Sequence, residues 1–441
     1  MPDQQSGPLE GYRVLELGNL VAAPYAGRLF AEFGAEVIKV ERPRSGDELR
    51  QWRLFKGDTS MFWRLQARNK KPITLDLRTP EGQAIVYDLI PHVDVVLENF
   101  RPGTLEKWNL GYETLKALNP DLILVRISGY GQTGPYRDRA GFGGIAEAMG
   151  GLRHITGYPD RPPTRIGISL GDTLAGLYGA FGALLALLNR ERSSGKLKSR
   201  VEQGQVAGEE GQNKAGSKDR EPVKGDGNVE GTGQVIDVAL YEAVFAVTEA
   251  LLPEYDGYGI ARERTGNILP GLTPSNIYPC KEDKWVVIGA NADTVFKRLM
   301  AAIGKPEFTT DPRFQNNVGR TAHQEYLDKA IGDWTSQHTL EEVLNRMIET
   351  GVPSGPIYSA ADIANDPHYQ SRAMIEDHEV SVEQGETRSV RFPGIVPKLS
   401  GTPGKTAWLG ADQGAFNEEI YGQLLNYQPE KLEQLKLEGV I

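Results

Sequence analysis

The chain has 441 residues, of which 39% are apolar and 24% are charged. Because this length exceeds one ordinary hydrophobic core, we expect two domains or one large discontinuous domain. The net charge of −10 argues against extensive binding to nucleic acid or to an acidic membrane, since neutralising phosphates requires a basic surface.

The first third of the chain alternates between short apolar runs and helical patterns. Helices are predicted at 24–33, after the start signal Thr79-Pro80, and near 104–118. Strands are predicted at 12–17, 36–40, 73–77, 93–97 and 122–126. This alternation predicts an α/β fold with a doubly wound, mostly parallel sheet, which binds ligands at the carboxyl ends of its strands. The loops on that side are 19–23, 41–44, 98–103 and 128–134.

These loops carry neither the glycine fingerprint of a dinucleotide site nor a phosphate-binding P-loop. Between Lys39 and Lys71, however, there are ten Lys or Arg residues and four acidic residues. Such a run is either a solvated surface or a patch that neutralises several phosphates. Because many of these residues fall in or beside predicted sheet-end loops, we favour the second interpretation and a compact, phosphate-rich ligand.

The longest apolar block, residues 173–188, is preceded by a single acid, Asp172. The block predicts a helix that begins at Thr173 and packs closely in the core, because it is apolar on all sides and rich in small residues. Asp172 then falls at the N-cap, where a carboxylate accepts hydrogen bonds from the first turn. Residue pattern alone leaves two roles open for Asp172, a structural cap or a chemical group.

Residues 196–233 contain no aromatic residue and are rich in glycine and charge, which predicts a disordered surface insertion. Beyond it, a helix at 238–252, a strand at 284–288, and helices at 292–303 and 328–350 predict a smaller α+β domain. Helices near 415–425 and 431–437 end the chain. We therefore predict a first part of the large domain at 1–195, the insertion at 196–233, the small domain at 234–345 and a return to the large domain at 346–441.

Other classes of site leave no signal. The single cysteine, Cys280, excludes a disulfide framework, and the six histidines lack the spacing of a zinc site. We therefore predict no metal. No signal peptide and no uncharged run of the roughly 20 residues needed for a membrane span is visible, so a soluble, cytoplasmic protein without a membrane or nucleic-acid partner is expected.

Several segments, taken in order, resemble the family III CoA-transferases. The similarity extends from about residue 8 to about residue 425, apart from the insertion. The family includes the formyl-CoA, carnitine and succinyl-CoA:dicarboxylate transferases, with the 2-methylacyl-CoA racemases as relatives. The segments that carry it are 9–17, 23–24, 33–43, 45–47, 68–71, 98–103, 129–135 and Gly171-Asp172.

The resemblance implies that Asp172 is the catalytic nucleophile. Its carboxylate would attack an acyl-CoA thioester and pass through an aspartyl anhydride and an aspartyl-CoA thioester before CoA reaches a free carboxylic acid. The substrates would be a coenzyme A thioester and a small carboxylic acid, with no tightly bound cofactor. The resemblance also implies which residues bind CoA. These are Val21, Ala22, Arg42, Asn69, Lys71, Asn99, Phe100, Gly103 and Lys107, with Phe142 bordering the nucleophile.

One departure separates the subclasses. The racemases carry His-Asp where this chain has Phe142-Gly143, and Phe cannot transfer a proton. A racemase or another acyl-CoA isomerase therefore remains only an alternative, as does a non-catalytic CoA-binding protein. The segment 266–276 has few of the glycines found in formyl-CoA transferases, which favours the succinyl-CoA-dependent members. The resemblance further implies a Rossmann-like large domain built from both chain ends and an interlocked homodimer.

Overall fold

The computed structural model describes residues 7–53, 55–56, 59–195, 231–383 and 386–441. The chain forms two compact units. The large unit combines 1–150, 166–248 and 376–441, and the small unit combines 151–165 and 249–375. Most of the predicted insertion, residues 196–230, lies outside the described residues, so its predicted disorder stays a prediction.

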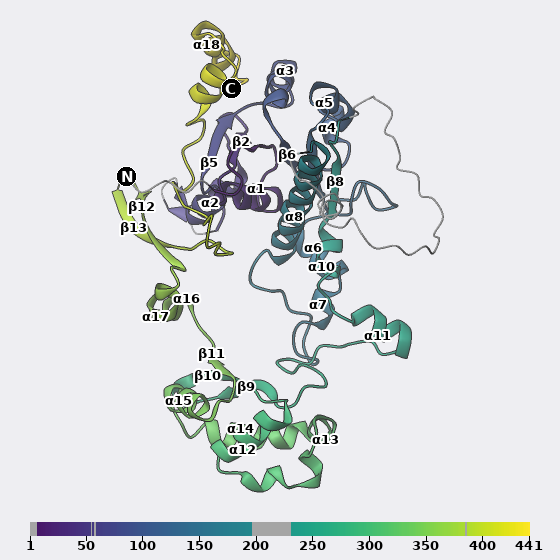
Figure 1. The fold of residues 1–441 in the computed structure, drawn as a ribbon, viewed down its shortest axis with the longest axis vertical. Coiled ribbons are helices and arrows are strands. Elements are labelled where there is room, and N and C mark those ends of the chain that lie inside the picture. Colours follow the sequence, from purple (N-terminus) through teal and green to yellow (C-terminus); the bar gives the residue numbers. More distant parts are fainter. Residues whose placement is uncertain (1–6, 54, 57–58, 196–230, 384–385) are drawn as a thin grey trace, which may run out of the picture. The chain divides into compact units, whose positions relative to one another are not determined.

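The large unit is built around a six-stranded parallel sheet (Figure 1). In order across the sheet its strands are β5 (Lys70–Thr74), β2 (Glu36–Glu41), β1 (Arg13–Glu16), β6 (Val95–Glu98), β7 (Ile123–Ser128) and β8 (Val235–Ala239). Counted along the chain this order is 3-2-1-4-5-6, the doubly wound arrangement in which ligands bind beside the first strand, where the winding reverses. The predicted fold class is confirmed.

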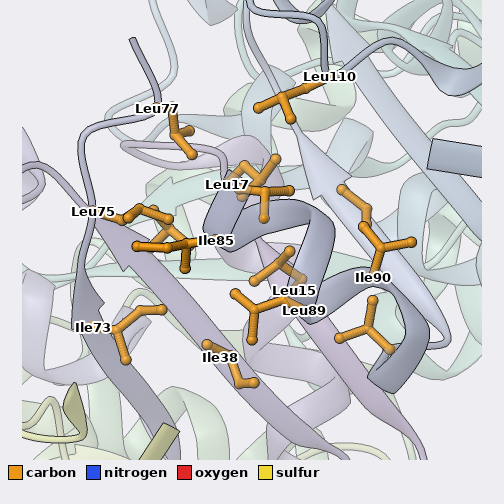
Figure 2. Close-up of a cluster of buried hydrophobic side chains, with 14 of the residues drawn as sticks. Leu15, Leu17, Ile38, Ile73, Leu75, Leu77, Ile85, Leu89, Ile90 and Leu110 are labelled. Carbon is orange, nitrogen blue, oxygen red and sulfur yellow. The ribbon is translucent and has the colours of Figure 1, made fainter. Parts of the chain in front are cut away.

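The sheet is covered on both faces because side chains alternate along each strand. Leu15 and Ile38 point into one core, shown in Figure 2, whereas Val14 and Val37 point into the other. The helices and short strands of the large unit are α1 (Ala22–Glu32), β3 (Phe55–Lys56), β4 (Thr59–Ser60), α2 (Met61–Gln66), α3 (Pro80–Leu89), α4 (Thr104–Lys107), α5 (Tyr112–Leu118), α6 (Gly143–Met149), α8 (Leu170–Ser193) and α10 (Leu240–Phe245). Thr79 caps α3 as predicted, accepting a hydrogen bond from the Gly82 N–H at 3.0 Å.

The helix α8 lies on the same core as α1, and its small residues let it approach the sheet closely. A side chain on Gly179 would place its Cβ 3.1 Å from Ile127 Cδ1. Only one face of α8 is buried, however, because Leu177, Phe181 and Leu185 on its other face are about half exposed. The prediction that the whole block packs in the core is therefore wrong for this face.

The end of the chain returns to the large unit. It forms the hairpin β12 (Ile375–Glu383) and β13 (Glu386–Pro393), a π-helix η7 (Glu418–Leu424) and α18 (Pro429–Leu437). Ile420, Tyr421 and Leu435 join Leu15 and Ile38 in one core. The large unit is thus built from both chain ends, as predicted.

The small unit has its own core and an antiparallel sheet, β11-β10-β9. Its elements are α7 (Leu152–Ile155), α11 (Leu251–Tyr258), β9 (Ser275–Pro279), β10 (Trp285–Gly289), α12 (Asp293–Ala302), α13 (Asn317–Ala322), α14 (Gln324–Thr335), α15 (Leu340–Thr350), β11 (Ser354–Pro356), α16 (Ala360–Asn365) and α17 (Pro367–Ser371).

The domain boundaries differ from those predicted at 234–345 and 346–441. Residues 235–239 form β8, which pairs with β7 in the large sheet, and the predicted helix at 238–252 is split into α10 and α11. The small unit also keeps α15 and β11, because β11 pairs with β10. Three of the five residues of 235–239 are β-branched, and the run adds an edge strand to a parallel sheet, which the adjacent insertion obscured in the sequence.

Candidate functional site

The carboxyl ends of β1 and β6 lie side by side, and their loops are joined by one side chain. The Asn99 Oδ1 atom accepts a hydrogen bond from the Asn19 N–H at 2.9 Å, and its Nδ2 atom donates to the Asn19 carbonyl at 2.8 Å. Both halves of the Asn99 amide are therefore used within the protein. Asn99 lies at the predicted edge, and its side-chain hydrogen bonds hold the loop after β1.

Two further side chains hold the same loop, which leads into Val21 and Ala22. Lys39, buried in β2, donates to the Gly18 carbonyl, and the Asp47 carboxylate accepts from the Leu20 N–H at 3.1 Å. Lys39 and Asp47 form an ion pair at 2.8 Å. Side chains thus hold the loop after β1 at Gly18, Asn19 and Leu20, before α1 begins.

Val21 and Ala22 open α1 at this edge and are themselves buried. They lie next to α8, because a Cβ on Gly176 would come within 2.5 Å of the Ala22 carbonyl oxygen. Gly176 follows Asp172 by about one helical turn. The predicted CoA loop and the predicted nucleophile are therefore neighbours in the large unit.

Phe100, Gly103 and Lys107 follow β6 at the same edge. Gly103 precedes α4 with a φ of 82°, a left-handed conformation that favours glycine. Phe100 packs edge-on against Trp108 with a ring separation of 5.1 Å. Lys107 ends α4 and is exposed, so its ammonium group is available to an anionic ligand.

Arg42 follows β2 and is also exposed, with an ion pair to Glu48 at 3.4 Å. A residue that the sequence analysis missed lies beside it. Arg78 follows β5 and pairs with Asp76 at 2.6 Å. The Arg78 hydrogen bond lowers the pKa of Asp76, and Arg42 adds to this effect, which indicates that both guanidinium groups lie near the carboxyl ends of β2 and β5. Arg78 directly follows the strand predicted at 73–77. This position in a sheet-end loop could have identified Arg78 as a candidate ligand-binding residue.

The structure does not bring Asn69 and Lys71 to this edge. Both lie where β5 begins, so they belong to the amino edge of the sheet. Asn69 accepts hydrogen bonds from the Ala407 and Trp408 amides and donates to the carbonyls of Ala31 and Lys405. Lys71 bridges Glu36 and Glu419, each at 2.7 Å or less. These two residues fasten the returning chain to the sheet, and their assignment to the CoA cleft is corrected.

The basic run between Lys39 and Lys71 is likewise not one phosphate patch. Lys39, Arg68 and Lys70 are fully buried. Arg68 pairs with Glu32 at 3.1 Å and Lys70 with Glu16 at 2.7 Å. Burial lowers the pKa of Lys70 to about 8, although Glu16 opposes this shift. Buried ion pairs of this kind explain much of the local excess of positive charge.

Asp172 lies in the first turn of α8, but it is not the N-cap. The helix begins at Leu170, its N-cap is Ser169, and Asp172 is the third helical residue. The expected capping role is therefore corrected. The carboxylate instead lies against Gly143 at the start of α6, where a Cβ on residue 143 would be 2.1 Å from Asp172 Oδ2. A glycine at 143 is required for this position of Asp172.

The two helices meet closely at this point. Glu147, buried in α6, accepts a hydrogen bond from the Gly171 N–H at 3.3 Å. Phe142 is the N-cap of α6, and it is 62% exposed. Phe142 directly precedes Gly143, the residue that lies against the Asp172 carboxylate. No racemase-type acid fits at 143, since its Cβ would collide with Asp172.

Because helices of a doubly wound fold run against the strands, α8 crosses from one edge of the sheet to the other. Near its end, Arg190 pairs at 2.7 Å with Asp94, which precedes β6 at the amino edge. Asp172, in the first turn of α8, is therefore at the carboxyl edge with Val21, Ala22, Arg42 and Phe100. In the described part of the chain, no group of three or more residues is arranged to hold a metal ion.

A family model described as CoA-transferase family III matches residues 9–207 and 226–413. The chain is 50% identical over 436 residues to a succinyl-CoA–D-citramalate CoA-transferase of Chloroflexus aurantiacus, with 98% of each chain covered. It is 36% identical over 441 residues to the alpha subunit of a succinyl-CoA–L-malate CoA-transferase of Chloroflexus aurantiacus, covering 99% of this chain and 94% of the other. A solved CaiB/BaiF family protein from Brucella suis is similar with a TM-score of 0.77 and 30% identity, covering 95% of this chain and 100% of that one. On these grounds, the chain belongs to CoA-transferase family III.

Proposed function

We propose that this CoA-transferase uses Asp172 as its nucleophile and succinyl-CoA as its donor. The observation that carries the proposal is the position of the Asp172 carboxylate. It lies against Gly143 at the carboxyl edge of the sheet, and about one helical turn from the contact between α8 and Ala22. A carboxylate held beside the loops that follow β1 and β6 can meet a thioester delivered there.

The chemistry requires a carboxylate at this point. Asp172 attacks the carbonyl carbon of the acyl-CoA, and the CoA thiolate leaves, so that a mixed anhydride forms. The thiolate then attacks the aspartyl carbonyl carbon and releases the donor acid, which leaves an aspartyl-CoA thioester. The acceptor carboxylate attacks this thioester and expels the thiolate, so that a second mixed anhydride forms. The thiolate then attacks the acyl carbon of the acceptor in this anhydride, which gives the new acyl-CoA and frees the Asp172 carboxylate.

The local structure supports this role. Asp172 lies in the first turn of a 24-residue helix, where the partial positive charge of the helix start favours the ionised carboxylate. It is half-buried, which limits its hydration without removing it from reach. The N-terminal amides of α8 are also suited to stabilise oxygen atoms that gain negative charge during the reaction.

We propose that CoA lies across the loops after β1, β2 and β6. Arg42 and Lys107 supply exposed positive charge for its phosphates, and Phe100, together with the backbone of Gly103, lines its pantetheine arm. Val21 and Ala22, buried at the start of α1, support the loop on which CoA would lie. Arg78 is a further candidate for a phosphate contact.

The names of two relatives suggest the acceptor class. Citramalate and malate are both four-carbon-backbone dicarboxylates with a 2-hydroxyl group, so we propose a 2-hydroxydicarboxylate acceptor. The test is to incubate the enzyme with succinyl-CoA and each acid of a matched set, namely citramalate, malate, isotopically labelled succinate, glutarate and oxalate, and to measure the acyl-CoA products by mass spectrometry. The proposal predicts the highest kcat/KM for a 2-hydroxydicarboxylate. A higher value for an acid without the hydroxyl group would contradict it.

The exposed face of α8 supports a homodimer. Five apolar side chains at helical spacing, each 40–56% exposed, form one stripe of Leu177, Phe181, Leu184, Leu185 and Leu188. Within the described residues, α8 is also the one helix whose length and composition would suffice to cross a membrane, but 44% of that stretch is buried inside the protein. We propose that a second copy of the chain covers the stripe, because an apolar patch of this kind marks an interface. Sedimentation should give a dimer in the wild type and a monomer after Leu185→Glu and Leu188→Glu. A wild-type monomer would contradict the proposal.

A further inference from the structure

The segment from Asn99 to Lys107 follows β6. It is anchored by three charged residues that were not predicted to bind CoA or to take part in catalysis. Glu98 is the last residue of β6, Arg126 lies in the neighbouring strand β7, and Glu106 lies in α4. Glu98 and Arg126 are buried, whereas the Glu106 side chain is 46% exposed. The segment between Glu98 and Glu106 contains Asn99, Phe100 and Gly103.

The Glu98 carboxylate holds the start of this segment. Its Oε2 atom accepts a hydrogen bond from the Phe100 N–H at 2.7 Å, and its Oε1 atom accepts from Arg126 Nε at 2.7 Å. Because both oxygens are used, the carboxylate fixes the chain direction as it leaves the strand. The Phe100 backbone cannot turn away without breaking a hydrogen bond to a charged acceptor.

Arg126 holds the end of the same segment. Its two terminal nitrogens donate to the two Glu106 oxygens at 2.6 Å and 3.2 Å. Such a forked pair fixes orientation as well as distance. The Arg126 guanidinium group therefore links Glu98, which precedes Asn99, to Glu106, which precedes Lys107.

We propose that Glu98, Arg126 and Glu106 are positioning residues that hold the segment from Asn99 to Lys107 in the shape that binds coenzyme A. This inference rests on the proposed function, because it takes that segment as part of the CoA site. The three residues act through Phe100 and α4 and do not contact the ligand. Without the contacts of Arg126 to Glu98 and Glu106, α4 and Lys107 would lose their fixed position relative to Phe100.

The anchor is sensitive to pH near neutrality. Burial raises the pKa of Glu98 to about 7, although Arg126 beside it lowers the pKa. The charged groups that face it are Arg126 from β7 and Glu106 from α4, and the pKa of Glu106 is lowered chiefly by its hydrogen bond from Arg126 and slightly by Arg137. As the pH falls from 8 to 6, Glu98 becomes protonated and its bonds to Phe100 and Arg126 weaken. CoA affinity should therefore fall over this range.

The first experiment measures CoA binding by calorimetry at pH 8 in the full-length wild type, in Glu106→Gln and in a control, Glu113→Gln. Glu113 is an exposed residue in the neighbouring helix α5, and its substitution makes the same change of charge. We expect Glu106→Gln to weaken CoA binding roughly three- to tenfold and Glu113→Gln to leave it unchanged. Equal binding by wild type and Glu106→Gln, or equal loss in both variants, would contradict the inference. Absence of CoA binding by the wild type would contradict the proposed function itself.

The second experiment compares wild type and Glu98→Gln at pH 6 and pH 8. The amide keeps an acceptor for Phe100 but cannot titrate, so the two proteins should bind CoA alike at pH 6 and the wild type should bind it more tightly at pH 8. The second ionisation of the CoA phosphate is common to both proteins and cancels in their ratio. If the ratio of the two CoA affinities, wild type to Glu98→Gln, were the same at both pH values, the assignment of Glu98 would be overturned. A residue with a purely structural role would not make this ratio depend on pH.

Discussion

The two edges of the central sheet carry similar residues with different surroundings. At the carboxyl edge, Arg42 and Lys107 are exposed, and Asp172 lies against a glycine. At the amino edge, Lys71 bridges two carboxylates, and the Asn69 side chain bonds to four backbone groups. The first edge has polar groups available to a ligand, whereas the second uses them to fasten the returning chain.

Strand direction explains this difference. Residues that follow a parallel strand lie at one edge, and residues that precede it lie at the other. Asn69 and Lys71 are close in sequence to the loops of the site. They lie at the beginning of β5, however, and therefore at the opposite edge of the sheet. The predictions below compare matched substitutions at the two edges.

The largest effect is expected for Asp172→Asn at the carboxyl edge. The amide cannot form the anhydride, so CoA transfer should fall by several orders of magnitude. Loss of one charge in the first helical turn should cost only about 0.3–1 kcal/mol of folding free energy. Steady-state kinetics and thermal unfolding measure the two effects separately.

The control is Asp94→Asn at the amino edge, where Asp94 pairs with Arg190 at 2.7 Å and accepts from the Arg13 N–H at 2.8 Å. This variant should lose stability but retain transfer. If Asp172→Asn retained CoA transfer at the rate of Asp94→Asn, the carboxyl edge would not hold the nucleophile.

Gly143→Ala should have the next largest effect, because its Cβ would lie 2.1 Å from Asp172 Oδ2 and must displace the carboxylate. Displacement by about 1 Å can reduce kcat on the order of a hundredfold, with the KM for the donor little changed. Gly422→Ala is a matched control, since a Cβ there meets no atom within 4 Å. A Gly143→Ala enzyme with wild-type kcat would show that the observed position of Asp172 is not needed for reaction.

Arg42→Ala and Lys71→Ala test the distribution of positive charge. Arg42→Ala should raise the KM for the CoA donor about tenfold, as expected for loss of a charged hydrogen bond of about 1.5 kcal/mol, and leave the KM for the acceptor unchanged. Lys71→Ala should leave both KM values unchanged and lower the melting temperature, because Glu36 and Glu419 lose their shared partner. The reverse pattern would restore Lys71 to the CoA site and remove Arg42 from it.

The smallest effect is expected for deletion of residues 197–230. The described residues on each side of them lie at the amino edge, where the Thr232 N–H donates to Asp121 at 2.8 Å and the Gly233 N–H to the Pro120 carbonyl at 3.1 Å. Because this edge is opposite Asp172, and loop length costs little entropy, turnover and melting temperature should stay near the wild-type values. A large loss of turnover alone would mean that the segment reaches the site.

Much of the fold could be predicted from the sequence, because apolar runs and cap residues such as Thr79 report local structure directly. The segment β8 was missed because its pairing partner lies more than a hundred residues away and an insertion precedes it. Within the site, Asp172, Arg42 and Phe100 are at the predicted edge. Asn69 and Lys71 are not: they precede the strand predicted at 73–77, so the strand direction already favoured the amino edge, whereas the family resemblance assigned them to the CoA cleft.

The close approach of Gly143 to Asp172 could not be predicted either. It depends on how two helices pack, and no local pattern records the distance between them. The packing of α6 against α8 places the carboxylate against Gly143, and the start of α8 at Leu170 places Asp172 inside the first turn and not at the cap.

The most direct test of the central claim is to trap the intermediate. Wild type incubated with succinyl-CoA and hydroxylamine should form a hydroxamate on the peptide that contains Asp172, because hydroxylamine attacks an anhydride or thioester but not a free carboxylate. Mass spectrometry of the digested protein locates the modified residue. The account predicts a hydroxamate at Asp172 that requires the acyl-CoA, whereas a hydroxamate at another residue, or none while CoA transfer proceeds, would contradict it.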